Sequence, residues 1–385
     1  MFCGREKETQ EILEHCRAGR FVVVTGHPGL GVTTLLIEGV APALRNFGFI
    51  VVRFHDWQGR FFRTQLVELI ADIVRDQADE GFLAASETLS EMLARIRRKT
   101  GRPVALLLDQ FEDYLRCHAG TDVSDSFDAD ISQAIGAHEC QVVLVLQDHA
   151  LSAFHRLEPY IPNLMGYRMR LGPLEEAGAR LLVTGTGHEE GVQFEPAVVD
   201  ALVKAPAAQH QGGVHPFYLI AGIRRLLDAA AEKNWTTATA GMIQIYGGAD
   251  RLILESLDLK LGKLNPTQTD LFFRWCGILI SSDEERLAVA AEALSEYSGR
   301  LNRFALSLIT VLMEEGILRT VELQGAIHYE IARDSLTLLI RDWWKRRETM
   351  LIARRRARFR VRSVSLAAGS ILALYAVWLF LSLKK

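Results

Sequence analysis

The sequence has little cysteine and no cysteine pattern. Its five cysteines are spread over 385 residues without any Cys-x-x-Cys pair. They are Cys3, Cys16, Cys117, Cys140 and Cys276. A disulfide framework needs clustered, paired cysteines, and a structural zinc site needs closely spaced ligands. We therefore expect reduced thiols in packed positions.

The chain also lacks an excess of positive charge and an N-terminal secretory signal. Lys and Arg number 44 against 47 Asp and Glu, which gives a formal net charge of -3. Binding to nucleic acid requires clustered Lys and Arg to neutralise phosphates. We expect no nucleic-acid partner, and we expect the bulk of the protein to stay in the cytoplasm.

One long hydrophobic run is present. Residues 363–383 carry no charged side chain, and ten of them are Leu, Ile, Val or Phe. At about 1.5 Å per residue, a helix of this length crosses the roughly 30 Å hydrocarbon core of a bilayer. A buried core helix is the alternative, but such helices are usually shorter and keep a polar stripe. We therefore predict a single transmembrane helix over residues 363–383.

A basic segment precedes this run. Six arginines lie just before it and only Lys384 and Lys385 follow it. The arginines are Arg354, Arg355, Arg356, Arg358, Arg360 and Arg362. Because basic residues favour the cytoplasmic side, we predict a tail-anchored protein with a juxtamembrane linker over residues 348–362. A lipid-binding or nucleic-acid-binding patch is the alternative reading of the same arginines.

A glycine-rich loop follows an apolar, β-branched run over residues 21–25. The spacing Gly26-x4-Gly31-x-Thr33 is that of a phosphate-binding loop, in which backbone N–H groups surround the phosphates and the threonine hydroxyl ligates Mg²⁺. We predict that it binds ATP or ADP. The predicted nucleotide-binding residues in the loop are Gly26, Gly29, Gly31, Val32, Thr33 and Thr34.

The lysine of such loops is missing, because Val32 takes its position. Losing a charge-assisted hydrogen bond costs about 1.5 to 3 kcal/mol, so nucleotide affinity would fall about ten- to a hundredfold. The transition state of hydrolysis would lose at least as much stabilisation. We therefore expect weak nucleotide binding, with weak or absent hydrolysis.

A second motif follows another apolar run. Residues 104–108 are all Val, Ala or Leu, and an acidic segment follows directly. In a P-loop fold this is the place of the acid that holds Mg²⁺ and of the acid that polarises the attacking water. We predict Asp109 and Thr33 as metal-binding residues and Glu112 or Asp113 as catalytic candidates. The alternative is that these acids cap a helix and interact with its dipole.

Further apolar runs alternate with amphipathic segments. Residues 49–53 and 141–146 predict strands, and residues 62–75 and 90–98 predict helices. Strands that alternate with helices indicate an α/β fold with a doubly wound parallel sheet. Its ligand would bind at the carboxyl ends of the strands.

Several longer motifs occur in a fixed order. They are Phe2-Cys3-Gly4-Arg5 with Glu8, Asp109-Gln110-Phe111-Glu112, Phe217-Tyr218-Leu219 after Pro216, Tyr329-Glu330-Ile331, and Asp334-Ser335-Leu336 before Trp343 and Trp344. In these motifs the sequence resembles the bacterial novel STAND family of AAA+-like P-loop signalling NTPases. The resemblance implies a P-loop NTPase domain over residues 1–172, a helical lid over 173–250 and a winged helix over 251–347.

The resemblance also implies further site residues. Gly4 and Arg5 would lie beside the nucleotide base, and Pro216 would contact the nucleotide from the lid. Arg333 stands where the wider class has a histidine on the ADP phosphates, so Arg333 or Arg5 is a candidate to replace the missing lysine. Gln147 and His149 stand where the family usually has an arginine and an acid.

The resemblance implies a switch, because nucleotide exchange in this class converts a closed monomer to an open oligomer. We expect a membrane-tethered switch or scaffold, anchored in the bacterial inner membrane, with a homo-oligomer or an unidentified protein as partner. A Mg²⁺-dependent ATPase and an adaptor that binds no nucleotide remain the alternatives. No dense basic helix supports DNA binding by residues 251–347.

Overall fold

The computed structural model describes residues 4–353, except residues 20, 60, 76–87, 119–121, 138–139, 162, 211, 282–284 and 324. The predicted transmembrane helix and residues 354–362 of the predicted linker lie outside the described residues. Among the described helices, none combines the length and the apolar composition that crossing a bilayer requires.

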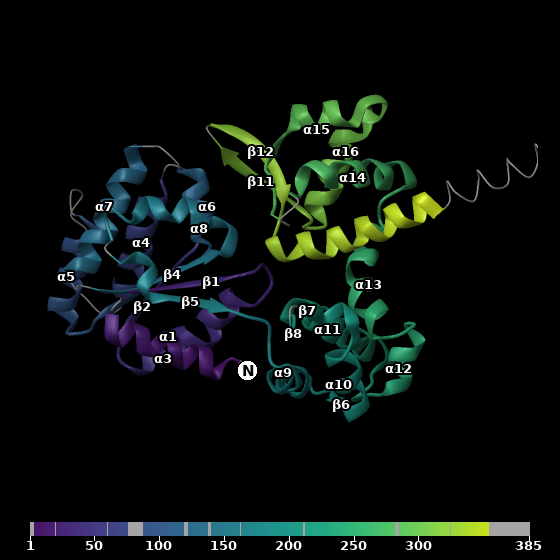
Figure 1. The fold of residues 1–385 in the computed structure, drawn as a ribbon, viewed down its shortest axis with the longest axis horizontal. Coiled ribbons are helices and arrows are strands. Elements are labelled where there is room, and N and C mark those ends of the chain that lie inside the picture. The colour runs from purple at the N-terminus through teal and green to yellow at the C-terminus, as the bar shows by residue number, and fades with distance from the viewer. Residues whose placement is uncertain are drawn as a thin grey trace, which may run out of the picture.

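A five-stranded parallel sheet forms the N-terminal part (Figure 1). Its strand order is β2-β3-β4-β1-β5. The first four strands match the four predicted ones, because fully buried strands read as continuous apolar runs. The fifth was not predicted, since Arg168 and Arg170 alternate with apolar residues at the sheet edge. The strands are β1 (Phe21–Gly26), β2 (Ile50–Phe54), β3 (Val104–Leu108), β4 (Cys140–Gln147) and β5 (Arg168–Leu171).

Helices cover both faces of this sheet, with a separate hydrophobic core on each (Figure 1). One face carries α1 (Glu6–Gly19) and a continuous helical segment made of α2 (Val32–Thr34), the π-helical η1 (Leu35–Val40) and α3 (Ala41–Asn46). The other face carries α4 (Phe62–Arg75), α5 (Leu89–Thr100), α6 (Phe111–Cys117), α7 (Asp122–Gly136) and α8 (Leu151–Phe154). The two predicted helices correspond to α4 and α5.

Trp57 fills the centre of the second core and fixes the end of β3. Its indole ring is fully buried and stands edge-on to Phe54 and Phe111. The indole N–H donates a hydrogen bond of 2.7 Å to the carbonyl oxygen of Asp109. The backbone of the predicted metal-binding acid is therefore held by the core below it.

A helical unit follows the sheet. It packs around α11, the longest helix of this part, and includes two short strand pairs. Its elements are α9 (Glu176–Glu189), β6 (Gln193–Phe194), α10 (Pro196–Val203), β7 (Gln209–His210), β8 (Gly213–Val214), α11 (Pro216–Lys233), β9 (Thr237–Ala238), α12 (Ala240–Ile245) and α13 (Ala249–Leu261).

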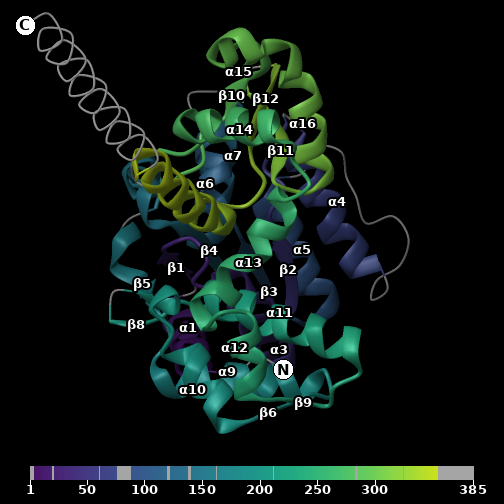
Figure 2. The same ribbon diagram turned by 90° about the vertical axis from the view of Figure 1, so that its right-hand side faces the viewer.

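The C-terminal unit combines helices with an antiparallel sheet of order β10-β12-β11. A last helix over residues 334–353 lies between this unit and the helical unit (Figure 1, Figure 2). One hydrophobic core runs through both units, and the predicted boundary at residue 250 lies within α13. The elements are α14 (Pro266–Leu279), β10 (Val289–Ala290), α15 (Ala291–Ser298), α16 (Ala305–Glu314), β11 (Leu318–Leu323) and β12 (Ala326–Ile331).

Two glycines bring the N-terminal segment against the helical unit. A Cβ atom on Gly178, in the first turn of α9, would lie 2.9 Å from the carbonyl oxygen of Gly4. A Cβ atom on Gly4 would lie 2.6 Å from the carbonyl oxygen of Gly178. The two backbones approach more closely than any side chain allows, so the segment around Gly4 is held by α9.

We expect Gly178→Ala to destabilise the protein by about 1 to 3 kcal/mol, because the added methyl group meets backbone that cannot move aside freely. The matched control is Gly277→Ala in α14, where a Cβ atom meets no atom of the described part of the chain within 4 Å. There the higher helix propensity of alanine should stabilise the protein by up to about 1 kcal/mol. Thermal unfolding of both variants tests this, and equal effects would contradict the close approach of Gly4 and Gly178.

Candidate functional site

The glycine loop has the backbone conformation that phosphate binding requires. Gly29 and Gly31 have φ angles of 78° and 85°, which side chains rarely allow. Among the described residues, the N–H groups of Gly29 and Gly31 make no hydrogen bond to another backbone group. The position of a Cβ atom on Gly31 is open, with no atom of the described residues within 4 Å. Backbone donors therefore remain available beside open space at the start of a helical segment.

Arg5 holds this loop in place by hydrogen bonds to backbone carbonyl oxygens. Its guanidinium is buried and donates hydrogen bonds to the carbonyl oxygens of Leu30, at 3.2 Å, and Gly172, at 2.6 Å. It also pairs with Glu8 at 2.5 Å. These bonds tie the glycine loop to the segment that links β5 to α9. Arg5 thus lies at the loop, and its donors already bind protein oxygens.

The start of α11 contacts the other side of the loop. His215, the residue before Pro216, places its Nε2 atom 3.1 Å from the carbonyl oxygen of Pro28. A Cβ atom on Gly29 would lie 2.8 Å from the His215 ring and 3.0 Å from Phe217. The predicted lid residue Pro216 therefore belongs to a turn that touches the loop. His215 was not predicted, because a lone histidine in a sequence carries no ligand spacing.

Asp109 and Thr33, the predicted metal-binding pair, lie together. The Thr33 hydroxyl donates to Asp109 Oδ1 at 3.2 Å, and the Gln110 N–H donates to the same oxygen at 3.0 Å. The other oxygen, Oδ2, accepts bonds from Nε of Arg53 at 3.2 Å and from its Nη2 at 2.7 Å. A carboxylate offers about four acceptor positions, so protein donors fill all of those on Asp109. As arranged, the pair does not present a free Mg²⁺ site.

Arg53 is the functional candidate that sequence reasoning missed. It is the fourth residue of β2, the strand next to β3, and its side chain is 25% exposed. A single arginine at the end of a buried strand was the available signal. Within the described part of the chain, no group of three or more His, Cys, Asp or Glu side chains is arranged to hold a metal ion.

Glu112, the first catalytic candidate, is buried in the first turn of α6. Burial, together with the nearby charges of Asp113 and Asp334, raises its pKa from 4.5 to about 8. The backbone N–H and the side-chain amide of Gln147 lie 3.3 and 3.2 Å from its two carboxyl oxygens. At neutral pH the carboxyl group is therefore mainly protonated.

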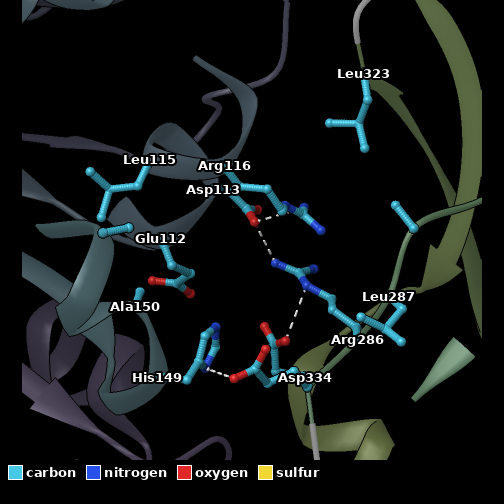
Figure 3. Close-up of a pocket in the computed structure, with 13 residues that line it drawn as sticks. Glu112, Asp113, Leu115, Arg116, His149, Ala150, Arg286, Leu287, Leu323 and Asp334 are labelled. Carbon is cyan, nitrogen blue, oxygen red and sulfur yellow. Dashed lines mark hydrogen bonds and ion pairs between the residues drawn. The ribbon is translucent and has the colours of Figure 1, made fainter. Parts of the chain in front are cut away.

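Asp113, the second catalytic candidate, belongs to an ion cluster instead (Figure 3). It pairs with Arg286 at 2.8 Å, Arg116 at 2.9 Å and Arg319 at 3.1 Å. Burial alone would raise the pKa of Asp113, but the three arginines together lower it. Asp113 is therefore ionised and held by cations at neutral pH.

Two further acids complete this cluster. Glu330 in β12 pairs with Arg116 at 2.5 Å and with Arg319 at 2.7 Å, and Asp334 pairs with Arg286 at 3.1 Å. Three arginines and three acids thus balance in charge. We call these six residues the ion cluster: Asp113, Arg116, Arg286, Arg319, Glu330 and Asp334. It joins α6 of the sheet unit to the C-terminal unit.

A cavity of about 360 Å³ lies beside the ion cluster (Figure 3). Glu112, His149 and Ala150 line it from the sheet unit, and Arg286 and Asp334 line it from the C-terminal unit. His149 faces Glu285 at 3.7 Å. The residues of the glycine loop do not line this cavity. It is therefore a space between two units that adjoins Glu112.

The remaining predicted residues separate into two groups. Gly26 ends β1 directly before the loop, and Val32, Thr33 and Thr34 form the helical turn α2 that follows the loop. Arg333, by contrast, is exposed before the helix over residues 334–353, and its side chain makes no hydrogen bond or ion pair with the described residues. The structure thus gathers the loop, Asp109 and Arg5, and places Arg333 beside the ion cluster residue Asp334.

Glu112→Gln should become more stable than the wild type as the pH rises. Because the folded-state pKa of Glu112 is raised, the folded state holds a proton that the unfolded state loses above about pH 4.5. Wild-type stability therefore falls between about pH 4.5 and 8, and the variant lacks this loss. The expected difference is on the order of a few kcal/mol at pH 9 relative to pH 5.

Chemical denaturation at both pH values measures this difference. Glu292→Gln, at an exposed position in α15, is the control for loss of a carboxyl group. A difference between Glu112→Gln and the wild type that stays constant from pH 5 to pH 9 would show that Glu112 is ionised in the folded protein.

The chain is similar to one protein family and to several solved structures. Residues 1–368 match the family model Novel STAND NTPase 1. Among solved structures, Cdc6p from Pyrobaculum aerophilum is 14% identical, with 90% of this chain and 95% of that chain covered and a TM-score of 0.45. A Walker-type ATPase of Pyrococcus abyssi is 15% identical, with 89% and 96% covered and a TM-score of 0.47.

No match is found among curated proteins. The family model, however, spans most of the chain and includes the glycine loop and the acidic segment after β3. The resemblance seen in the sequence is thereby confirmed at the level of the family. The protein belongs to the Novel STAND NTPase 1 family of nucleotide-binding P-loop NTPases.

Proposed function

We propose that this protein is a nucleotide-controlled conformational switch that hydrolyses ATP weakly or not at all. ATP or ADP would bind at the glycine loop, and the output would be a change of conformation or oligomeric state. The main support for this proposal is the ion cluster, in which Asp113 contacts the C-terminal unit and is not free to act in hydrolysis.

The acids after β3 are poorly placed for hydrolysis. Glu112 is mainly protonated at neutral pH, so it is not available to take a proton from water. Asp113 is paired with three arginines, and Val32 replaces the lysine that would stabilise charge on the transferred phosphoryl group. These features favour binding of nucleotide over turnover.

The ion cluster has the properties of a releasable contact. Arg286 is 5% exposed and Glu330 is fully buried, so their charges depend on one another in the closed state. Buried ion pairs contribute little net stability, because desolvation offsets their attraction, whereas loss of one partner costs about 3 to 5 kcal/mol. If the units separate, water solvates all six charges. The closed and open states can therefore lie close in free energy.

A chain of contacts links this interface to the nucleotide loop. His215 touches the loop at Pro28, and Tyr218 in the first turn of α11 donates a hydrogen bond of 2.8 Å to Asp342. Asp342 belongs to the helix that begins at Asp334. A phosphate that moves the loop would thus shift α11 against this helix, which supports nucleotide control of the ion cluster.

The architecture supports the finer domain assignments. A winged helix consists of three helices and a small antiparallel sheet, and the C-terminal unit has α14, α15, α16 and the sheet β10-β12-β11. The helices α9 to α13 are consistent with a helical lid. We propose that the winged helix acts as the latch of the switch and has no nucleic-acid partner. Its residues Arg286 and Arg319 are engaged by acids of the ion cluster.

We further propose that residues 363–383 anchor the protein in a membrane, with the N-terminal bulk in the cytoplasm. A bacterial inner membrane fits the family resemblance. Clustering of anchored copies, or recruitment of another protein, would then be the output. The support is the uncharged run itself and the six arginines that precede it.

Asp113→Asn in the full chain tests the switch. The variant leaves one buried arginine charge in excess, so we expect a cost of about 3 to 5 kcal/mol and a melting temperature lower by several degrees. Amide hydrogen exchange in β11 and β12 should rise more than tenfold. The control is Asp270→Asn, which removes an exposed ion pair with Arg347 inside the C-terminal unit.

Nucleotide should act on the same segments. In the wild type, ATP and ADP should change exchange in β11 and β12 to different extents, because only differential binding shifts a two-state equilibrium. If neither nucleotide changes exchange there, and Asp113→Asn behaves like Asp270→Asn, the protein is not a switch of this kind.

Leu372→Arg tests the anchor. The full-length wild type should remain in the membrane pellet after alkaline carbonate extraction. An arginine at the middle of the run opposes insertion by roughly 2.5 to 3.5 kcal/mol, so a larger share of the variant should become extractable. Release of the wild type into the supernatant would contradict the proposed anchor.

A further inference from the structure

We propose that Arg53 supplies the cation of the nucleotide site in place of both the loop lysine and Mg²⁺, so that a nucleoside di- or triphosphate binds without a divalent metal. This inference rests on the proposed nucleotide binding and names the residue that makes it possible. Its basis is the bonding of Asp109.

The carboxylate of Asp109 is saturated by protein donors. Thr33 and Gln110 occupy Oδ1, and two N–H groups of Arg53 occupy Oδ2. Mg²⁺ needs oxygen ligands, directly or through water, in near-octahedral geometry. To reach Asp109 it would have to displace Arg53 from a fully buried carboxylate. The arginine therefore competes with the metal for the same oxygen.

The position of this contact is fixed on both sides. Strands β2 and β3 are parallel neighbours, with Arg53 opposite Leu107 and Phe54 opposite Leu108. The Asp109 N–H donates to the Phe54 carbonyl oxygen at 2.8 Å, and Trp57 holds the Asp109 carbonyl oxygen. Arg53 thus belongs to a rigid edge of the sheet, and only its side chain can adjust.

Arg53 also keeps the capacity to bind a phosphate. Its bonds to Asp109 use Nε and Nη2, and the side chain makes no other hydrogen bond with the described residues. A guanidinium has five N–H donors, and it remains charged at all physiological pH values. The side chain is 25% exposed. One carboxylate separates it from the hydroxyl of Thr33, at the end of the glycine loop.

The other cations near the loop are committed elsewhere. Arg5 binds the carbonyl oxygens of Leu30 and Gly172. Arg168 and Arg170 in β5 pair with Asp148 at 3.5 and 2.9 Å. Of the arginines that the structure describes near the loop, Arg53 is therefore the best placed to compensate for Val32.

Isothermal titration of the full chain with ATP and ADP, in 5 mM Mg²⁺ and in EDTA, tests the proposal. The wild type should bind with affinities that agree within about threefold in the two buffers. Arg53→Gln should weaken binding about tenfold or more, as expected for loss of a charge-assisted contact. Arg53→Lys, which keeps the charge, should lose less. Arg45→Gln, at an exposed position in α3, is the control.

Val32→Lys provides a second, independent measurement. It restores the loop cation, so Arg53→Gln should cost less affinity in the Val32→Lys background than in the wild type. Ile37→Lys, at an exposed position five residues further along, controls for added charge. Equal losses in both backgrounds would show that Arg53 does not replace the lysine.

The remaining outcomes separate this inference from the proposed function. Binding that disappears in EDTA would overturn metal independence and leave the nucleotide switch standing. Wild-type affinity in Arg53→Gln would overturn the role of Arg53 alone. Absence of wild-type binding in both buffers would overturn the inference and the nucleotide switch together. The comparison of buffers uses the wild type, so it remains decisive even if Arg53→Gln fails to fold.

Discussion

Burial of three acids directly after β3 is the constraint on which the site depends. Asp109, Glu112 and Asp113 are each at least nine-tenths buried, and an uncompensated charge in such surroundings is costly. The protein resolves this in three ways. Arg53 neutralises Asp109, a proton neutralises Glu112, and three arginines neutralise Asp113. The elements that carry these arginines must therefore lie next to the buried acids.

The partners of Asp113 mark where the C-terminal unit meets the sheet unit. Arg286 and Arg319 come from residues far along the chain, yet both reach an acid at the start of α6. Glu330 of the C-terminal unit pairs with Arg116 of α6 and so offsets part of the positive charge of the arginines around Asp113. The Tyr-Glu-Ile motif over residues 329–331 and the acidic motif after β3 are thereby parts of one contact. In the proposed switch, an exchange of nucleotide at the loop would act on this contact through α11.

Much of the sheet unit could be predicted, because its information is local. Continuous apolar runs predict β1 to β4, and the glycine spacing predicts the loop. The edge strand β5 and the partners of the buried acids could not be predicted. Arg53 and Arg286 look like ordinary surface arginines in the sequence, since only tertiary pairing distinguishes them. For the same reason the sequence predicts Asp113 as a catalytic candidate, whereas the structure pairs it with the three arginines of the ion cluster.

The cation at the loop bears on the balance between binding and turnover. Mg²⁺ brings two positive charges and bridges the β- and γ-phosphates as charge develops between them. A guanidinium brings only one positive charge, and two hydrogen bonds hold it on Asp109. It can therefore attract a phosphate, but it cannot move to stabilise the charge that develops between the phosphates in the transition state. A site built around Arg53 would retain nucleotide and stabilise the transition state of hydrolysis poorly. In the proposed switch, which would signal by occupancy, Val32 would then be tolerated because slow hydrolysis keeps the occupied state long-lived.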